Sequence, residues 1–193
     1  MPIIEKINKN NCRIAVWNTN ESLNELIKLA EDLDTQHINN DKRKKECLTI
    51  RVLLQQLRLF TEITYNSYGA PEIKENNFIS ISHSEDLTAI IVSKNKVGLD
   101  IEKISEKALK LSSKFIKQNT HIPLSKDKAT LIWCCKEAIY KWHQKGNVNF
   151  SNDIVISPFT IKREGILIAK FKQRKLTLYY KKIKTHFLVY VCK

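Results

Sequence analysis

Two carboxylates stand two residues apart in a segment that has the composition of a short strand. Asp100 and Glu102 lie in residues 97–102, Val-Gly-Leu-Asp-Ile-Glu. Side chains two apart on a strand point to the same face, so the two like charges would repel each other. A hard cation such as Mg²⁺ relieves that repulsion, because it prefers carboxylate oxygens, phosphates and water as ligands. The alternative interpretation is a solvated sheet face that holds no metal.

A third carboxylate, Glu137, lies in residues 133–141, Trp-Cys-Cys-Lys-Glu-Ala-Ile-Tyr-Lys. On a helix, Glu137 and Lys141 would share one face, because they are four residues apart. The pair adds one carboxylate to those of Asp100 and Glu102. Taken alone, it is more typical of a surface ion pair worth roughly a few tenths of a kcal/mol.

One histidine also stands where it could contact a phosphate. His83 lies in Ile81-Ser82-His83-Ser84, which we place at a strand end with residues 83–86 as a polar loop. Its imidazole and the hydroxyl of Ser82 could donate to phosphate oxygens, although a lone loop histidine is usually incidental. Gly98, two residues before Asp100, would let a phosphate or another stretch of backbone approach closely.

Hydrophobic periodicity predicts the elements that would position these residues. We expect strands at 13–17, 78–82, 87–93, 97–101, 154–156, 165–171, 175–180 and 186–191. We expect helices at 22–31, at 107–116 and from Pro123 to about Lys145, with Gly146 as the stop of the last. Another helix has a predicted apolar face of Cys47, Ile50, Leu53, Leu54, Leu57 and Phe60, beside a basic stripe of Lys44, Arg51 and Arg58.

The order of these elements predicts an α+β fold. Strand, helices and strands are followed by strand, helices and strands again, which indicates two similar subdomains related by a pseudo-two-fold axis. Each would be a small antiparallel sheet packed with helices. We place the boundary at residue 98, with one subdomain at 1–98 and the other at 99–193.

Charge and cysteine content predict the type of partner and the cellular compartment. The 193 residues include 33 Lys and Arg against 20 Asp and Glu, a net charge of +13, which predicts an anionic partner. The five cysteines are odd in number and two of them, Cys134 and Cys135, are adjacent. We therefore expect no disulfides and a reduced, cytoplasmic compartment. No apolar run approaches the ~20 residues of a membrane span, so we expect no membrane contact.

Several common site motifs are missing. The sequence has no Cys-x-x-Cys pair and no His-x-x-x-His, so a structural zinc site is not expected. It also has no Gly-x-Gly-x-x-Gly and no Gly-x-x-x-x-Gly-Lys-Ser/Thr, which disfavours dinucleotide and P-loop nucleotide binding.

Three segments, taken together and in order, resemble the 4'-phosphopantetheinyl transferase superfamily. They are Ile-Ser-His-Ser at 81–84, Val-Gly-Leu-Asp-Ile-Glu at 97–102, and Trp-x-x-Lys-Glu-Ala-x-x-Lys at 133–141. The subtype they resemble is the surfactin-synthetase-activating group, in which a single chain forms a pseudodimer. The resemblance runs from about Lys42 to the end of the long helix.

The resemblance implies transfer of 4'-phosphopantetheine from coenzyme A to a serine of an acidic acyl or peptidyl carrier protein, with release of 3',5'-ADP. It implies that Asp100, Glu102 and Glu137 hold Mg²⁺, with Mn²⁺ as an alternative, and that Glu137 and Lys141 are catalytic. It also implies that coenzyme A is bound by Arg51, Ser82, His83 and Lys136. A pseudodimer would be a monomer, because one chain forms the whole cleft.

The sequence departs from the family pattern at two places. The turn before the first motif reads Gly69-Ala70-Pro71, where the family usually has Gly-Lys-Pro, so one basic contact to coenzyme A is missing. An acidic residue is also missing near Asn119 and Thr120. Neither change removes an expected metal ligand.

Three other functions compete with this interpretation. The first is a non-catalytic member of the same fold that binds coenzyme A or a carrier protein. The second is a nucleic-acid-binding protein, but none of the helix-turn-helix, zinc-finger or aromatic RNA-binding signatures is present, so we expect no nucleic acid partner. The third is an unrelated Mg²⁺-dependent phosphohydrolase, which would not specifically require His83 or Lys141.

Overall fold

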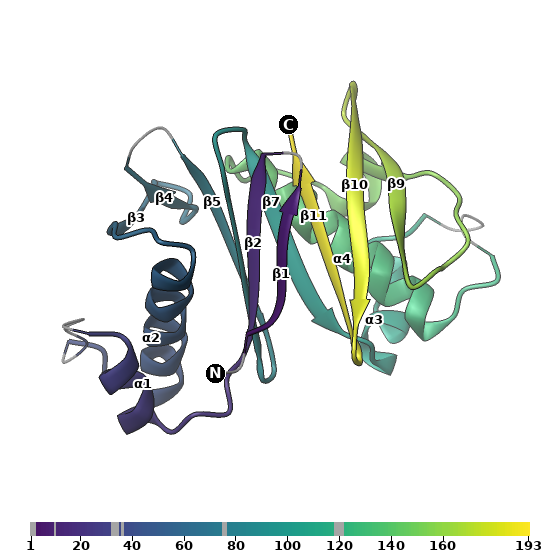
Figure 1. Ribbon diagram of the computed structural model, residues 1–193. Helices are drawn as coiled ribbons and strands as arrows, with labels where there is room; N and C mark the ends of the chain where they lie inside the picture. Colours follow the sequence, from purple (N-terminus) through teal and green to yellow (C-terminus); the bar gives the residue numbers. More distant parts are fainter. Residues whose placement is uncertain (1–2, 10, 32–34, 36, 75–76, 118–121) are drawn as a thin grey trace.

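Two antiparallel sheets pack face to face, and each carries helices on its outer face. The computed structural model describes the chain except residues 1–2, 10, 32–34, 36, 75–76 and 118–121. Figure 1 shows α2 (Asp41–Gln56) outside one sheet and α4 (Lys126–His143) outside the other. The predicted α+β class, with two similar halves, is confirmed.

The first half forms a six-stranded sheet in the order β1-β2-β6-β5-β4-β3. Its strands are β1 (Ile3–Lys9), β2 (Cys12–Asn18), β3 (Ile63–Tyr65), β4 (Pro71–Ile73), β5 (Phe78–Ser84) and β6 (Leu87–Ser93). The second half forms a five-stranded sheet in the order β7-β11-β10-β9-β8. Its strands are β7 (Val97–Lys103), β8 (Ile154–Ile156), β9 (Glu164–Phe171), β10 (Arg174–Ile183) and β11 (His186–Cys192). The chain passes between the sheets from β6 to β7, and the functional division at residue 98 stays a prediction.

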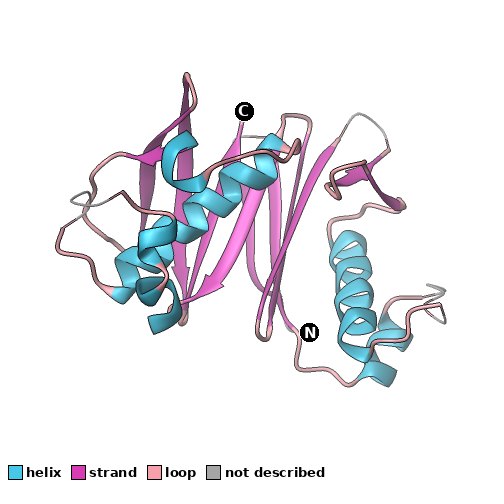
Figure 2. Ribbon diagram, turned by 180° about the vertical axis from the view of Figure 1, so that it is seen from behind, coloured by secondary structure: helices cyan, strands magenta, loops and turns pink. Residues whose placement is uncertain are grey.

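Polar side chains begin the two long helices. The side chain of Asn40 accepts a hydrogen bond from the backbone of Arg43 at the start of α2, and Ser125 does the same for Lys128 at the start of α4. The shorter helices are α1 (Leu23–Leu29), α3 (Glu106–Lys110), a 3-10 turn (Ser112–Lys114) and α5 (Phe150–Asp153). Figure 2 shows α4 crossing the face of the second sheet diagonally.

The layering explains why the central strands are apolar on both faces. Strand β6 is buried along its whole length, because helix α2 covers one face of its sheet and the second sheet covers the other. Strand β7 alternates instead. Val97, Leu99 and Ile101 pack between the sheets, and the residues between them face α4. Asp100 and Glu102 therefore point to the same side, as the spacing predicted.

The predicted bounds of several elements were wrong. Helix α2 ends at Gln56, so Arg58, with a backbone φ of 55°, lies outside the helix and its basic stripe, and Phe60 is 75% exposed rather than part of the apolar face. Helix α4 begins at Lys126 and stops at Gln144, which takes a left-handed conformation before Gly146 is reached. The predicted helix at 107–116 divides into α3 and a 3-10 turn. Strands β1, β3 and β4 were not predicted.

One cysteine pair also differs from expectation. The structure joins the sulfurs of Cys12 on β2 and Cys192 on β11 in a disulfide across the two sheets, whereas the sequence analysis expected none. A separation of 180 residues gave no sign that the two strands meet. Cys47, Cys134 and Cys135 are free thiols, and the cytoplasmic compartment stays a prediction.

Two further sequence expectations concern residues 118–121 and a membrane span. The missing acidic residue near Asn119 and Thr120 falls outside the described residues. Over the described part of the chain, no helix has the length and apolar character required to cross a bilayer.

Candidate active site

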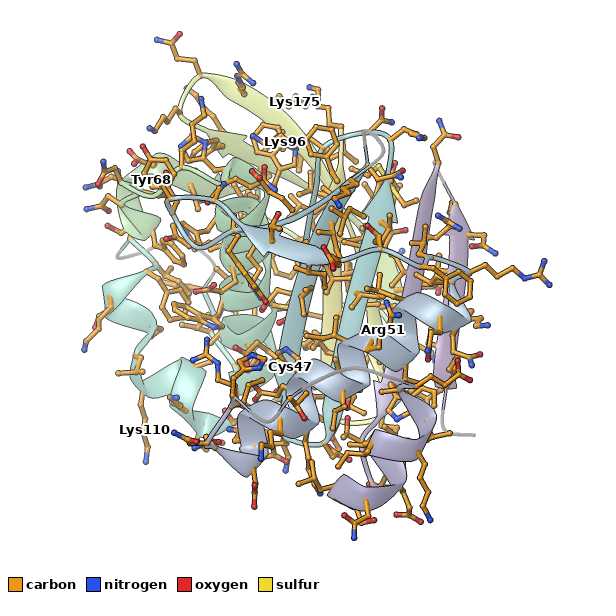
Figure 3. All side chains as sticks on the ribbon, turned by 90° about the vertical axis from the view of Figure 1, so that its left-hand side faces the viewer. Cys47, Arg51, Tyr68, Lys96, Lys110 and Lys175 are labelled. Atoms are coloured by element: carbon orange, nitrogen blue, oxygen red, sulfur yellow. A yellow bond between two sulfur atoms is a disulfide. The ribbon has the colours of Figure 1, made fainter. Side chains whose placement is uncertain are left out.

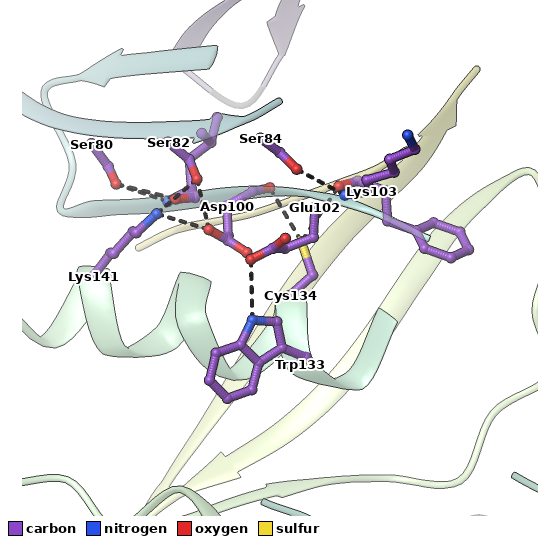
Figure 4. A network of polar contacts seen from close by, with 11 residues as sticks. Ser80, Ser82, Ser84, Asp100, Glu102, Lys103, Trp133, Cys134 and Lys141 are labelled. Atoms are coloured by element: carbon purple, nitrogen blue, oxygen red, sulfur yellow. Dashed lines mark hydrogen bonds and ion pairs between the residues drawn. The ribbon is translucent and has the colours of Figure 1, made fainter. Parts of the chain in front are cut away.

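The two sheets meet through a row of serines on β5. Ser80, Ser82 and Ser84 occupy alternate positions, so their hydroxyls point to the same side, toward β7 (Figure 4). The Ser80 hydroxyl accepts a hydrogen bond from the backbone N–H of Leu99 at 3.0 Å. The Ser84 hydroxyl accepts one from the backbone N–H of Lys103 at 2.9 Å. These contacts fix β7, and with it Asp100, against the first half of the molecule.

Asp100 is the buried centre of the polar network in Figure 4. It is 3% exposed, and its Oδ1 accepts hydrogen bonds from the Ser82 hydroxyl at 2.7 Å and from the Lys141 amine at 2.8 Å. Lys141 also donates to the Ser82 hydroxyl at 2.8 Å. The other carboxylate oxygen, Oδ2, is buried and accepts no hydrogen bond from any described residue. A buried anionic oxygen without a partner is costly, which makes it a candidate ligand atom.

Glu102 lies two residues further along β7. Its Oε1 accepts a hydrogen bond from the indole N–H of Trp133 on α4 at 3.2 Å. Burial raises the pKa of Glu102, the negative charge of Asp100 raises it further, and the Trp133 hydrogen bond opposes the change. The two strand carboxylates therefore crowd each other, as the sequence predicted.

Glu137 approaches the same two carboxylates from α4. Burial is the main cause that raises the pKa of Glu137 to about 7, and the charge of Asp100 adds to it, while Lys141 acts in the opposite direction. A carboxyl group with this pKa exchanges a proton near neutral pH. It is therefore suited to accept a proton from a weakly acidic group.

Gly98 on β7 allows β7 and α4 to approach each other closely. A Cβ placed on Gly98 would lie 2.0 Å from the carbonyl oxygen of Ala138 and 2.5 Å from the backbone nitrogen of Trp142. Only glycine fits, because β7 touches the backbone of α4 at this point. The sequence left two possible neighbours for Gly98, a phosphate or another stretch of backbone. In the structure the neighbour is the backbone of α4.

A cavity of about 320 Å³ opens beside these groups. Glu137 and Lys141 line it from the second half, and His83 lines it from the first. Its remaining wall includes the turn at residues 68–71 and the strand residues Ile79 and Ile81. The cavity therefore lies between the two halves of one chain.

His83 lies within β5 rather than in a loop, because only Glu85 and Asp86 form the turn to β6. Its Nδ1 is 3.1 Å from the hydroxyl of Thr88. Burial lowers the pKa of His83, Glu46 opposes that effect, and Lys141 lowers the pKa further. Strand alternation directs His83 into the cavity, while the Ser82 hydroxyl binds Asp100 and Lys141. The structure therefore gives Ser82 and His83 different partners.

Arg51 lines a second cavity, of about 340 Å³, between α2 and β3. Ile50 and Tyr65 line both cavities, so the two adjoin, and Figure 3 shows Arg51 on α2. The Nε of Arg51 is buried and has no hydrogen-bond acceptor within the described chain. An unpaired guanidinium nitrogen beside a cavity is consistent with an anionic ligand.

Lys136 is not brought to this site. It is 3% exposed, and its amine donates hydrogen bonds to the backbone carbonyls of Phe150, at 2.6 Å, and Ile154. Burial lowers its pKa to about 8. The geometry gives Lys136 a structural role in tying α4 to the segment that contains α5 and β8.

The carboxylates fit a divalent cation chemically but are not gathered around one point. Among the described residues, no three His, Cys, Asp or Glu side chains form a ready ligand set. However, Asp100 has an unpartnered buried oxygen, and it raises the pKa of both Glu102 and Glu137. A cation would offset this excess negative charge, so the donor set suits a hard metal.

The sequence analysis missed two kinds of residue at this site. Ser80 and Ser84 position β7, and the period of two in Ser-Ile-Ser-His-Ser was a signal that could have shown it. Trp133 was quoted as part of a motif, but its hydrogen bond to Glu102 had no separate signal in the sequence.

Comparison with known proteins adds two findings. A family model described as the 4'-phosphopantetheinyl transferase superfamily matches residues 96–192, a range that includes Asp100, Glu102, Glu137 and Lys141. The protein named 4'-phosphopantetheinyl transferase gsp, from Aneurinibacillus migulanus, is 31% identical in an alignment 140 residues long that covers 67% of this chain and 57% of that relative. The chain therefore spans little more than half the length of this relative.

Proposed function

The chain belongs to the 4'-phosphopantetheinyl transferase superfamily, and from that membership we propose that it transfers 4'-phosphopantetheine from coenzyme A to a serine of an apo carrier protein. The observation that carries the proposal is the cavity between the halves, which Glu137, Lys141 and His83 line, with Asp100 and Glu102 close enough to raise the pKa of Glu137. The product besides the modified carrier is 3',5'-ADP.

The proposed reaction is a phosphoryl-type displacement. The serine oxygen of the carrier forms a bond to the phosphorus nearest the pantetheine, and the bond from that phosphorus to the bridging pyrophosphate oxygen breaks. Glu137 takes the serine proton as general base, because its carboxylate lines the cavity in which the serine would lie. Lys141 neutralises charge on the departing phosphate, and its position beside Asp100 keeps its amine at the cavity wall.

Asp100, Glu102 and Glu137 are the residues that would hold Mg²⁺ or Mn²⁺. When bound, the metal would polarise the phosphorus and offset the negative charge of the pyrophosphate. The buried, unpartnered Oδ2 of Asp100 supports this assignment.

Coenzyme A would lie in the cavity between the halves, with His83 near a phosphate. Arg51 is proposed to meet a phosphate from the adjoining cavity, which its unpaired Nε supports. Ala70 supplies no charge where the family usually has lysine, so we expect His83, Arg51 and Lys141 to provide most of the phosphate contacts.

The proposed oligomeric state is a monomer. The cavity takes His83 from the first half and Glu137 from the second half of the same chain, so it needs no second copy. The net charge of +13 suits an acidic carrier protein as the partner.

The test is the intact mass of an apo carrier protein after incubation with the purified chain, coenzyme A and Mg²⁺. We expect an increase of one phosphopantetheine, and Glu137→Gln should abolish it. No increase across several carriers, with coenzyme A binding still measurable, would favour the alternative of a non-catalytic member that only binds coenzyme A or a carrier.

A further inference from the structure

The C-terminal end of α4 borders a third cavity, whose walls are strongly basic. A cavity of about 480 Å³ lies where the C-terminal end of α4 meets the turns before β7 and between β9 and β10. Its charged or titratable residues are Lys96, His143, Lys145, Lys172 and Arg174, and no carboxylate lines it. Figure 3 labels Lys96, which lines this cavity, and Lys175 at the same end of the molecule.

The positive charge in this cavity is not balanced by the protein. Within the described chain, Lys96, Lys145, Lys172 and Arg174 form no ion pair with a carboxylate. Burial lowers the pKa of Lys96, and the charges of Lys145 and Arg174 lower it further. Like charges held this close repel one another, and a bound anion would relieve that repulsion.

One residue of the cavity wall also has a buried hydrogen-bond donor without a partner. Trp142 lines the cavity and is 5% exposed, yet its indole N–H has no acceptor among the described residues. The other two indoles are satisfied, since Trp17 donates to Glu21 at 3.1 Å and Trp133 donates to Glu102 at 3.2 Å. Buried donors are normally paired, so an orphaned one needs an explanation.

One of the cations is held in place before any ligand arrives. The Lys96 amine donates to the backbone carbonyl of His143 at 3.1 Å and lies 5.0 Å from the centre of the Trp142 ring. A fixed cation loses little side-chain freedom when it binds an anion. The donors also converge from three separate segments, which suits a compact ligand better than an extended surface.

From these observations we propose that this basic cavity binds a small molecule carrying two phosphate groups. A diphosphate can contact more of the cations of this cavity than a single phosphate, and phosphate oxygens accept hydrogen bonds from both amines and guanidinium groups. The site is separate from the candidate active site. Gln144 and Gly146 line the active-site cavity, whereas His143 and Lys145 line this one, so the end of α4 divides the two.

Nuclear magnetic resonance of the three indole N–H groups tests the proposal site by site. Inorganic pyrophosphate is the probe, added without metal to full-length protein saturated with coenzyme A, so that the active-site cavity is filled. We expect a saturable shift of the Trp142 resonance, assigned with Trp142→Phe, while Trp17 stays unchanged. A shift confined to Trp133, or no saturable shift, would overturn the proposal.

A pair of matched double variants locates the binding. Lys172→Gln with Arg174→Gln removes two exposed charges at the cavity end of the β9–β10 hairpin. Lys162→Gln with Arg163→Gln removes the same charges at the opposite end, where β9 begins. We expect about a 10-fold or greater loss of pyrophosphate affinity in the first pair and little change in the second.

Two results from these variants would contradict the proposal. Equal weakening in both pairs would mean that pyrophosphate responds to net charge and not to this cavity. Tighter binding of an acidic polypeptide than of pyrophosphate, read at Trp142, would mean that the surface docks a protein. An unchanged Trp17 resonance shows in each case that the variant is folded.

Discussion

Replacing Gly98 with alanine tests whether the contact between β7 and α4 sets the geometry of the candidate active site. The added Cβ would lie 2.0 Å from the Ala138 carbonyl oxygen, 2.5 Å from the Trp142 nitrogen and 2.7 Å from the Trp142 Cβ. Two of these atoms are helix backbone and cannot rotate away. Because real Cβ atoms almost never approach other atoms closer than 3.0 Å, α4 must retreat from β7 by about 1 Å or more.

Such a movement has both an energetic and a catalytic cost. Overpacking a close-packed core typically costs about 1–3 kcal/mol, and the backbone contacts place Gly98→Ala at or above the top of that range. Alanine also lowers the conformational entropy of the unfolded chain, which offsets about 0.4–1 kcal/mol of this loss in stability. Asp100 lies on β7 and Glu137 on α4, so a shift of about 1 Å between them should lower the rate of transfer by about 100-fold.

Urea unfolding and the carrier-protein transfer assay measure the two effects separately. Gly165→Ala in β9 is the control, because the nearest atoms to its Cβ would belong to the side chain of Tyr180, the first at 3.0 Å, and not to backbone. We expect a smaller stability loss and nearly normal transfer in this variant. A Gly98→Ala protein that is as stable and as active as the wild type would refute the reasoning.

The remaining predictions concern charged groups around the site. Glu137 has a folded pKa of about 7 against a usual value of 4.5, so the folded protein favours its protonated form. The free energy of unfolding should therefore be highest below pH 4.5 and fall by up to about 3 kcal/mol as the pH rises through 7. Glu137→Gln should remove this fall, which urea unfolding at a series of pH values measures. Lys141→Met leaves the buried Asp100 without its cation, and we expect about 3 kcal/mol of destabilisation in urea unfolding at neutral pH; a loss of the same size when Asp100→Asn is already present would contradict the ion pair. Lys136→Met should lower stability by about 2 kcal/mol, because two backbone carbonyls lose a donor, yet leave coenzyme A affinity unchanged in calorimetry; a large loss of affinity would return Lys136 to the binding site.

Local periodicity predicted the parts of this fold that depend on one buried face. The pair Asp100 and Glu102 lies on the face of β7 that its spacing required, because side-chain direction on a strand depends only on position parity. Helix α4 was predicted from its hydrophobic spacing, and Leu131, Cys135, Ala138 and Trp142, which recur at helical spacing, are buried. Three motifs in a fixed order then indicated the superfamily, which the comparisons with known proteins show.

Features that depend on contacts between distant segments were not predictable from one sequence. Phe60 continues the apolar spacing of α2, but the helix ends four residues earlier and leaves the ring exposed. Lys136 precedes Glu137 directly in a motif, yet adjacent side chains on a helix point about 100° apart, so Lys136 faces the segment that contains α5. The pairing of Cys12 with Cys192 required knowledge of how the two sheets pack.

The intact mass of a carrier protein tests the central claim most directly. An apo carrier is incubated with coenzyme A and Mg²⁺ together with either the wild-type chain or Asp100→Asn, which keeps the size of the side chain but removes its charge. The account predicts that the wild type adds one phosphopantetheine to the carrier serine and that Asp100→Asn adds none, although it still binds coenzyme A. Equal modification by both proteins would contradict the role of the carboxylate cluster, and modification by neither would contradict the proposed transfer.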